Sequence, residues 1–97
     1  MLKAAAAAIA AVLFTADSAG DPKPVERTVE NLRAEAAHVT KALGQDGEDR
    51  ALLTVPLYHS FGFDVGLVAA LSVGAALYLE DEVAPNKIVK LIREQRI

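Results

Sequence analysis

The sequence has 97 residues, which allows one small domain, and a formal net charge of −3 with a pI near 5.3. It has no cysteine, which excludes disulfides, thiolate metal sites and cysteine nucleophiles, and no basic patch that would bind nucleic acid. Hydrophobic residues make up 53% of the chain, more than a small domain readily buries, which predicts self-association or docking to another chain.

The first nineteen residues admit two interpretations. Lys3 followed by an eleven-residue apolar run and small residues at 16–18 has the layout of a signal peptide, which would make the protein exported. The alternative is an extra helix over residues 1–10 that leads into a buried strand at Ala10–Thr15. We favour the second interpretation, because residues 15–25 read better as a functional loop, and we therefore expect a cytoplasmic protein.

A loop at Ala16–Pro24 follows this strand, since Gly, Asp, Ser and Pro cluster there. The next helix is predicted to begin after Thr28 as its N-cap and to end at Gly44. Its apolar residues repeat at a spacing of three and four: Val29, Leu32, Ala36, Val39 and Leu43. A turn and a second strand at Arg50–Val55 follow, and Pro56 ends that strand because it cannot donate to a sheet.

A loop at residues 56–60 leads into a buried helix over Phe61–Val73, in which only Asp64 and Ser72 are polar. A third strand at Ala75–Leu79 and a last helix from Pro85 complete the chain. The sequence therefore predicts an α/β fold: a small three-stranded, mainly parallel sheet flanked by three or four helices. No membrane span is expected, since the apolar stretch at 65–79 is shorter than the roughly twenty residues required.

Two loops follow predicted strands and carry polar side chains. The first combines hydroxyls, a glycine and a lysine, a composition that can surround phosphate oxygens, although it lacks the Walker A pattern and by composition alone favours a plain surface loop. The second carries Tyr58 and His59. Because ligands bind at the carboxyl edge of open α/β sheets, we expect the strand ends at Thr15 and Pro56 to face one crevice. Two isolated histidines, His38 and His59, argue against a metal site.

Both loops resemble signatures of the adenylate-forming (AMP-binding) superfamily, which includes acyl-CoA synthetases, luciferases and peptide-synthetase adenylation domains. LFTADSAGDPKPV at residues 13–25 resembles the family's phosphate loop, T-S-G-T-T-G-x-P-K-G-V, and PLYHSFG at residues 56–62 matches its P-L-[FY]-H-x-F-G signature. The resemblance extends from about Ala11 to the end of the chain. It implies that residues 1–97 form a single partial subdomain of the family's N-terminal domain.

The resemblance also implies a reaction and roles for residues. The parent enzyme would join a carboxylic acid to ATP, forming an acyl-adenylate, and pass the acyl group to the thiol of coenzyme A or a carrier protein. His59 would be the catalytic residue, beside the adenylate. ATP would be bound by the first loop, with Thr15 near Mg²⁺ and no metal held by the protein alone. The residues implied for ATP are Thr15, Ser18, Gly20 and Lys23.

Departures from the family pattern predict weak or absent ATP binding. Asp17 replaces a glycine, and two like charges about 4 Å apart repel by roughly 4 kcal/mol at an effective dielectric constant near 20. Pro24 replaces another glycine and removes an N–H group. The family's further motifs lie beyond the equivalent of Ile97, so we expect this chain alone to be inactive. The alternatives are a non-catalytic interaction module and a small exported protein.

Overall fold

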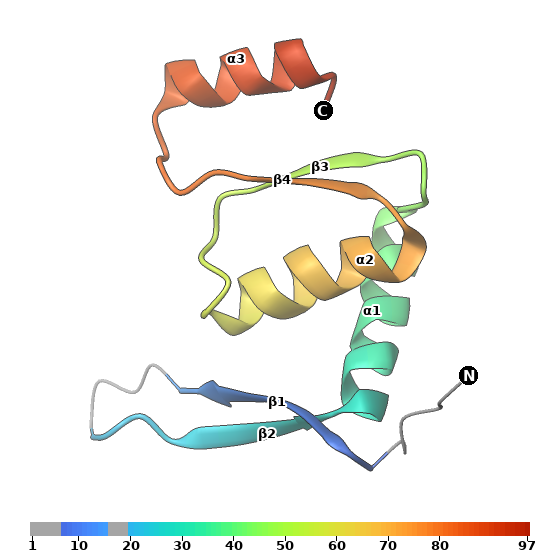
Figure 1. Ribbon diagram of the computed structural model, residues 1–97, viewed down its shortest axis with the longest axis vertical. Helices are drawn as coiled ribbons and strands as arrows, with labels where there is room; N and C mark the ends of the chain where they lie inside the picture. The colour runs from blue at the N-terminus through green and yellow to red at the C-terminus, as the bar shows by residue number, and fades with distance from the viewer. Residues whose placement is uncertain (1–6, 16–19) are drawn as a thin grey trace.

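The computed structural model describes residues 7–15 and 20–97 (Figure 1). The elements in chain order are β1 (Ile9–Phe14), β2 (Pro24–Thr28), α1 (Val29–Leu43), β3 (Arg50–Leu53), the π-helix η1 (Phe61–Val68), α2 (Ala69–Val73), β4 (Ala76–Leu79) and α3 (Pro85–Gln95). Residues 1–6 and 16–19, on which the two interpretations of the N-terminus depend, lie outside the described ranges.

The described strands form two separate two-stranded sheets. β1 is antiparallel to β2, with Phe14 opposite Pro24 and Ile9 opposite Thr28, while β3 is parallel to β4, with Arg50 opposite Ala76. The α/β class is confirmed, but the expected single three-stranded sheet is wrong. Its first strand, β1, instead pairs with β2, a strand that was not predicted. This pairing is possible because two antiparallel strands need only a short connecting loop.

The residues predicted from the sequence to begin or end helices do so in the structure. The Thr28 hydroxyl accepts a hydrogen bond from the Asn31 backbone N–H, and the Asn31 side chain accepts one from the Thr28 N–H, each at 3.0 Å. This reciprocal capping begins α1, and Gly44 ends it at φ 65°. Gly74 ends α2 in the same left-handed conformation, and Pro85 is the first residue of α3.

The helix predicted at residues 61–73 is confirmed, but it is buried only in part, since Phe61 and Leu71 are exposed. Its first eight residues form a π-helix, η1, that continues directly into α2. It lies against the β3–β4 pair, with α1 packed on its other flank (Figure 1). Two glycines allow the close approach to β3 and to the segment that follows it. A Cβ on Gly62 would overlap the carbonyl oxygen of Pro56, and one on Gly66 would lie 2.6 Å from Leu53 Cδ1.

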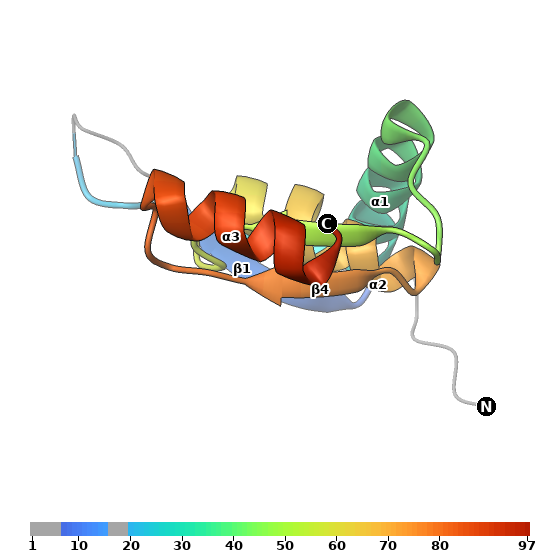
Figure 2. The same ribbon diagram turned by 90° about the horizontal axis from the view of Figure 1, so that it is seen from above.

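The described core consists of small side chains. The buried hydrophobic residues are Ala36, Leu53, Ala69, Ala70 and Ala75. β1 was expected to be a buried strand, but this is wrong, since Phe14 at its end is 64% exposed. Figure 2 shows α1 standing to one side of the other elements. Among the described residues, no helix combines the length and the apolar character needed to cross a membrane.

Candidate functional site

The first candidate loop is closed by two hydrogen bonds between Thr15 and Lys23. The Thr15 N–H donates to the Lys23 carbonyl oxygen at 2.9 Å, and the Lys23 N–H donates to the Thr15 hydroxyl oxygen at 3.0 Å. Both residues extend the β1–β2 hairpin, which places the ends of the loop side by side. Two of the predicted site residues are thus brought together, and the Thr15 hydroxyl proton remains able to donate elsewhere.

Of the other residues predicted for this loop, the structure describes some and not others. Gly20 is exposed, and a Cβ built on it would meet no atom of the described residues within 4 Å, so these residues leave its backbone open to a ligand. Ser18 and Asp17 lie outside the described residues. Pro24 is the first residue of β2, opposite Phe14, rather than part of the loop as predicted.

The second candidate loop presents an exposed histidine whose orientation is set by its neighbours. β3 ends at Leu53, and the His59 N–H donates to the Pro56 carbonyl oxygen at 3.0 Å, which forms a turn before η1. The Phe61 N–H donates to His59 Nδ1 at 3.2 Å. Since Nδ1 is an acceptor, the proton of a neutral His59 ring lies on Nε2, which leaves Nε2 as the donor available to a ligand.

The two loops do not share a sheet edge, because β1 and β3 belong to different sheets. The prediction that both strand ends lie at the edge of one sheet is therefore wrong. Figure 1 places the end of β1 and the segment after β3 on the same side of the molecule, with the β1–β2 hairpin below η1. No hydrogen bond or ion pair joins Thr15 or Lys23 to His59 among the described residues.

An ion pair that was not predicted from the sequence joins the hairpin to the helix that follows the second loop. Arg27 Nη1 on β2 donates to Asp64 Oδ2 on η1, and Arg27 Nη2 lies 3.8 Å from Glu35 Oε2 on α1. Asp64 was predicted to be a polar exception on an apolar helix, but it is only 5% exposed. An isolated acid within an apolar helix is the signal in the sequence that indicates a buried partner.

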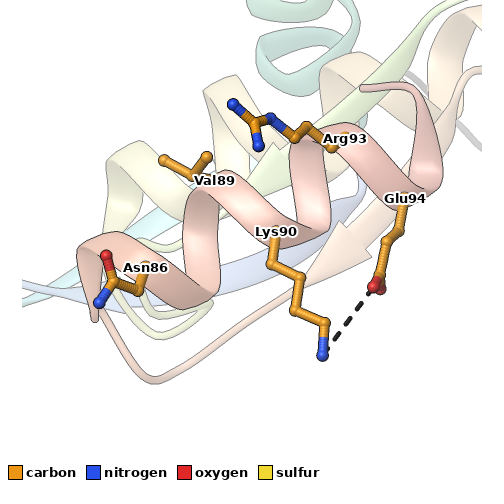
Figure 3. Close-up of a pocket in the computed structure, with 5 residues that line it drawn as sticks. All are labelled: Asn86, Val89, Lys90, Arg93 and Glu94. Carbon is orange, nitrogen blue, oxygen red and sulfur yellow. Dashed lines mark ion pairs between the residues drawn. The ribbon is translucent and has the colours of Figure 1, made fainter.

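Small hollows border these elements without joining the two loops. One of about 180 Å³ lies between α1 and η1 and is lined by Glu35, Ser60, Phe61, Asp64 and Val65. Another of about 240 Å³ lies at the carboxyl edge of β3 and β4 and includes Leu53, Leu57 and Leu79. The hollow in Figure 3 is lined by α3 alone, where Lys90 and Glu94 form an ion pair at 3.9 Å. None of these three contains Thr15, Lys23 or His59.

The acidic turn after β4 is tied to α3 by its charges. The Glu82 N–H donates to Glu80 Oε1 at 3.0 Å, and Lys87 Nζ lies 3.1 Å from a carboxylate oxygen of each glutamate. The Glu82 N–H, followed by Lys87, holds the pKa of Glu80 below its ordinary value. Hydrogen bonds to Glu82 and Glu80 raise the pKa of Lys87. These contacts connect β4 to α3 and leave the turn without a free acid–base pair.

Comparison with known proteins finds CoA ligases among the proteins that this chain resembles. Residues 2–97 match the family described as AMP-binding enzyme. The chain is 34% identical over 88 residues to the medium-chain fatty-acid–CoA ligase of Escherichia coli K12, covering 91% of this chain and 16% of the relative. It is 32% identical over 89 residues to the 2-succinylbenzoate–CoA ligase of Staphylococcus aureus (strain Newman), covering 92% and 18%.

Solved structures of other proteins share this fold. The o-succinylbenzoate CoA synthetase of Bacillus subtilis, solved with AMP, has a TM-score of 0.87 and 25% identity over 96% of this chain and 19% of that one. ATP-bound MatB of Rhodopseudomonas palustris has a TM-score of 0.86 and 22% identity, covering 95% and 18%. The chain spans about 15 to 18% of the length of the sequence relatives it matches. Since the family match covers residues 2–97, the chain belongs to the AMP-binding enzyme family.

Proposed function

We propose that this chain supplies the phosphate-binding loop and the His59 loop of an ATP-dependent acid–thiol ligase. In the first step, a carboxylate oxygen of the acid attacks the α-phosphorus of ATP, which forms an acyl-adenylate and releases pyrophosphate. In the second step, a thiol attacks the acyl carbon, and AMP leaves. The observation that carries the proposal is the closed loop between Thr15 and Lys23, at the positions that match the family's phosphate loop.

The closed loop fits the chemistry of a polyphosphate. The Lys23 side chain is exposed and would place its ammonium group against the β- and γ-phosphates, where charge accumulates as pyrophosphate leaves. The Thr15 hydroxyl accepts from the Lys23 N–H and can donate its own proton to a phosphate oxygen. Open space around Gly20 lets phosphate approach the backbone. We assign Ser18 to the same loop as a further hydroxyl donor.

His59 would act at the other end of the ligand. Because its Nδ1 accepts from the Phe61 N–H, the ring of a neutral His59 offers the Nε2–H group to a carbonyl or phosphate oxygen. This donor is suited to hold the acyl-adenylate and to control access of the thiol. The names of the relatives, a fatty-acid–CoA ligase and a 2-succinylbenzoate–CoA ligase, support coenzyme A as the thiol and a carboxylic acid as its acyl partner.

Mg²⁺ would be bound mainly through the nucleotide. The described residues contain no cluster of three or more acidic, histidine or cysteine side chains able to hold a metal alone. Mg²⁺ keeps several waters and commonly binds substrate phosphates with few protein ligands, and the Thr15 hydroxyl lies at the loop's closure. When bound, the ion would neutralise part of the phosphate charge, while Lys23 and Thr15 orient the phosphates.

Calorimetric titration with ATP tests the proposal. Lys23→Met and Thr15→Val should each weaken binding, the former by about tenfold or more, since a charge-assisted hydrogen bond contributes roughly 1.5–3 kcal/mol. Asp17→Gly combined with Pro24→Gly should strengthen binding, because a carboxylate near the phosphates is removed and an N–H is restored. Lys90→Met, which changes an exposed lysine on α3, is the matched control. Equal ATP affinities in all these variants would contradict the assignment of the loop.

The same proposal predicts no turnover by this chain alone. Catalysis requires the acid, ATP and thiol to be held together, and two loops on one small unit cannot position all three. We therefore expect no ATP–pyrophosphate exchange from the 97-residue chain. Exchange by the isolated chain, abolished by Lys23→Met, would instead show that these residues are sufficient for adenylation.

A further inference from the structure

A buried ion pair links the segments that follow the two candidate loops. Asp64 is the one buried charged residue among those described, and its Oδ2 accepts a hydrogen bond from Arg27 Nη1. The Arg27 side chain is itself only 16% exposed. Arg27 also lies 3.8 Å from Glu35, so a single guanidinium group on β2 contacts both α1 and η1.

The pair is close to both loops along the chain. Arg27 lies four residues after Lys23 on β2, and Asp64 lies five residues after His59 on η1. Within the ranges 7–15 and 20–97, it is the only side-chain hydrogen bond or ion pair that joins the β1–β2 hairpin to η1. The orientation of the first loop relative to the second therefore depends on this contact and on the packing of α1.

The chemistry of the pair favours a geometric role over a stabilising one. Asp64 Oδ1 is buried and has no hydrogen-bond partner among the residues that the structure describes, so these residues satisfy only one of its two oxygens. A buried ion pair recovers its desolvation cost only when its remaining oxygens are also hydrogen-bonded. An apolar pair of similar size would stabilise this interface at least as well. What a charged pair adds is one defined relative position of β2 and η1.

We propose that Arg27 and Asp64 are positioning residues that fix the loop closed by Thr15 and Lys23 relative to the loop that carries His59. The purpose of this fixed spacing rests on the proposed function, in which the first loop holds the phosphates and the second holds the acyl end of one adenylate. Neither Arg27 nor Asp64 touches the ligand in this arrangement. They act by fixing the distance between the two loops that contact the ligand.

The distance between the loops can be measured directly, since the chain has no cysteine and engineered cysteines label selectively. Spin labels at Asp21→Cys and Tyr58→Cys, both exposed positions beside the two loops, report this distance by double electron–electron resonance in the full chain. The labelled parent is compared with Arg27→Met, Asp64→Asn and Arg27→Lys. Lys87→Met, which breaks the ion pairs between the acidic turn and α3, is the control.

We expect one narrow distance distribution in the parent, its loss in Arg27→Met and Asp64→Asn, and its recovery in Arg27→Lys, which keeps the positive charge. Far-UV circular dichroism should stay unchanged in every variant, and Lys87→Met should keep the parent distribution. Any of three results overturns the proposal: a broad distribution in the parent, a narrow one in both charge-deleting variants, or loss of the folded spectrum in those variants. The last result would make the pair a determinant of folding rather than of position.

An ATP titration of the unlabelled parent separates this inference from the proposed function. A narrow distribution that depends on the ion pair, together with no ATP binding even after the Asp17→Gly and Pro24→Gly changes, supports the positioning role and refutes the proposed function. ATP binding by the parent, together with an unchanged loop distance in Asp64→Asn, supports the proposed function and refutes the positioning role.

Discussion

At the scale of single residues, two glycines permit the contact between η1 and the end of β3. At Gly62, a Cβ would overlap the Pro56 carbonyl oxygen and lie 2.9 Å from that of Val55, and both are backbone atoms that cannot move aside. At Gly66, the nearest atoms belong to the side chain of Leu53, which can rotate. The two positions therefore differ in how much a methyl group costs, although both lie on the same helix.

Gly62→Ala should destabilise the fold. The gain in helix propensity, about 1 kcal/mol, is smaller than the strain of an overpacked site, about 1–3 kcal/mol, because the neighbouring atoms are backbone. Urea unfolding followed by circular dichroism measures the change. Gly20→Ala, at a position with open space, should stay within about 0.5 kcal/mol of the parent. If Gly62→Ala is as stable as Gly20→Ala, η1 does not lie close enough to Pro56 for a methyl group at residue 62 to overlap its carbonyl oxygen.

Glu80 gives stability a dependence on acidic pH. Its pKa in the folded chain is lowered from the ordinary value of 4.5, first by the Glu82 N–H and then by Lys87. The unfolded state therefore binds more protons in this range. The contribution of Glu80 to stability is present above pH 4.5 and is lost as pH falls through the folded pKa. Glu80→Gln should flatten this part of the dependence of unfolding free energy on pH.

The order of the two causes can be tested at the same residue. Lys87→Met removes the ammonium group but leaves the Glu82 N–H, so the pKa of Glu80 should rise yet stay below its ordinary value. An NMR titration of the Glu80 carboxyl carbon gives both values. A full return to the ordinary value would make Lys87 the main cause.

At the scale of elements, α1 is the helix whose ends are best defined by the sequence. Thr28→Ala removes the hydroxyl that accepts from the Asn31 N–H and should cost about 1 kcal/mol of folding free energy. Thr40→Ala makes the same chemical change inside α1, where the hydroxyl donates to the carbonyl oxygens of Ala36 and Ala37 and caps no free N–H group, and should change stability by less than about 0.5 kcal/mol. Urea unfolding of both variants checks the difference, and equal losses would contradict the capping role of Thr28.

Local signals located most elements but not all of them. Thr28, Gly44, Gly74 and Pro85 set helix ends through conformations that depend on neighbouring residues alone, so these boundaries could be predicted. β2 was missed because Pro24 was assigned to the loop. The residues that follow, Val-Glu-Arg-Thr at 25–28, do not alternate between apolar and polar, so the sequence carries no period-two signal for a strand that turns back on β1.

Pairing and burial depend on contacts distant in sequence, and here prediction failed. Nothing in the residues around Asp64 specifies Arg27, which lies 37 positions earlier, as its partner. The closure of the first loop by Thr15 and Lys23 was also not predicted, although both were named as site residues. The sequence located the candidate residues through the family signatures, but the relation between the two loops depends on the fold.

At the scale of the whole molecule, more large hydrophobic side chains are exposed than buried among the described residues. The described core has four alanines and one leucine. The large hydrophobic side chains that are exposed are Ile9, Val12, Phe14, Val25, Leu43, Leu57, Tyr58, Phe61, Leu71, Leu79, Val83, Val89 and Ile92. Surfaces of this kind mark interaction sites, which favours the second candidate function, an interaction module that self-associates or docks to another chain.

This candidate predicts association that depends on protein concentration. Val12 and Phe14 lie on one face of the β1–β2 hairpin and are 47% and 64% exposed. If that face is covered in a self-associated form, Val12→Glu with Phe14→Glu should shift the equilibrium toward monomer, because two carboxylates cannot be buried without partners. Asn86→Glu with Ala37→Glu adds the same charge at exposed helical positions and should leave association unchanged. Sedimentation equilibrium at several concentrations measures both variants, and a parent that is monomeric throughout would argue against self-association through this face.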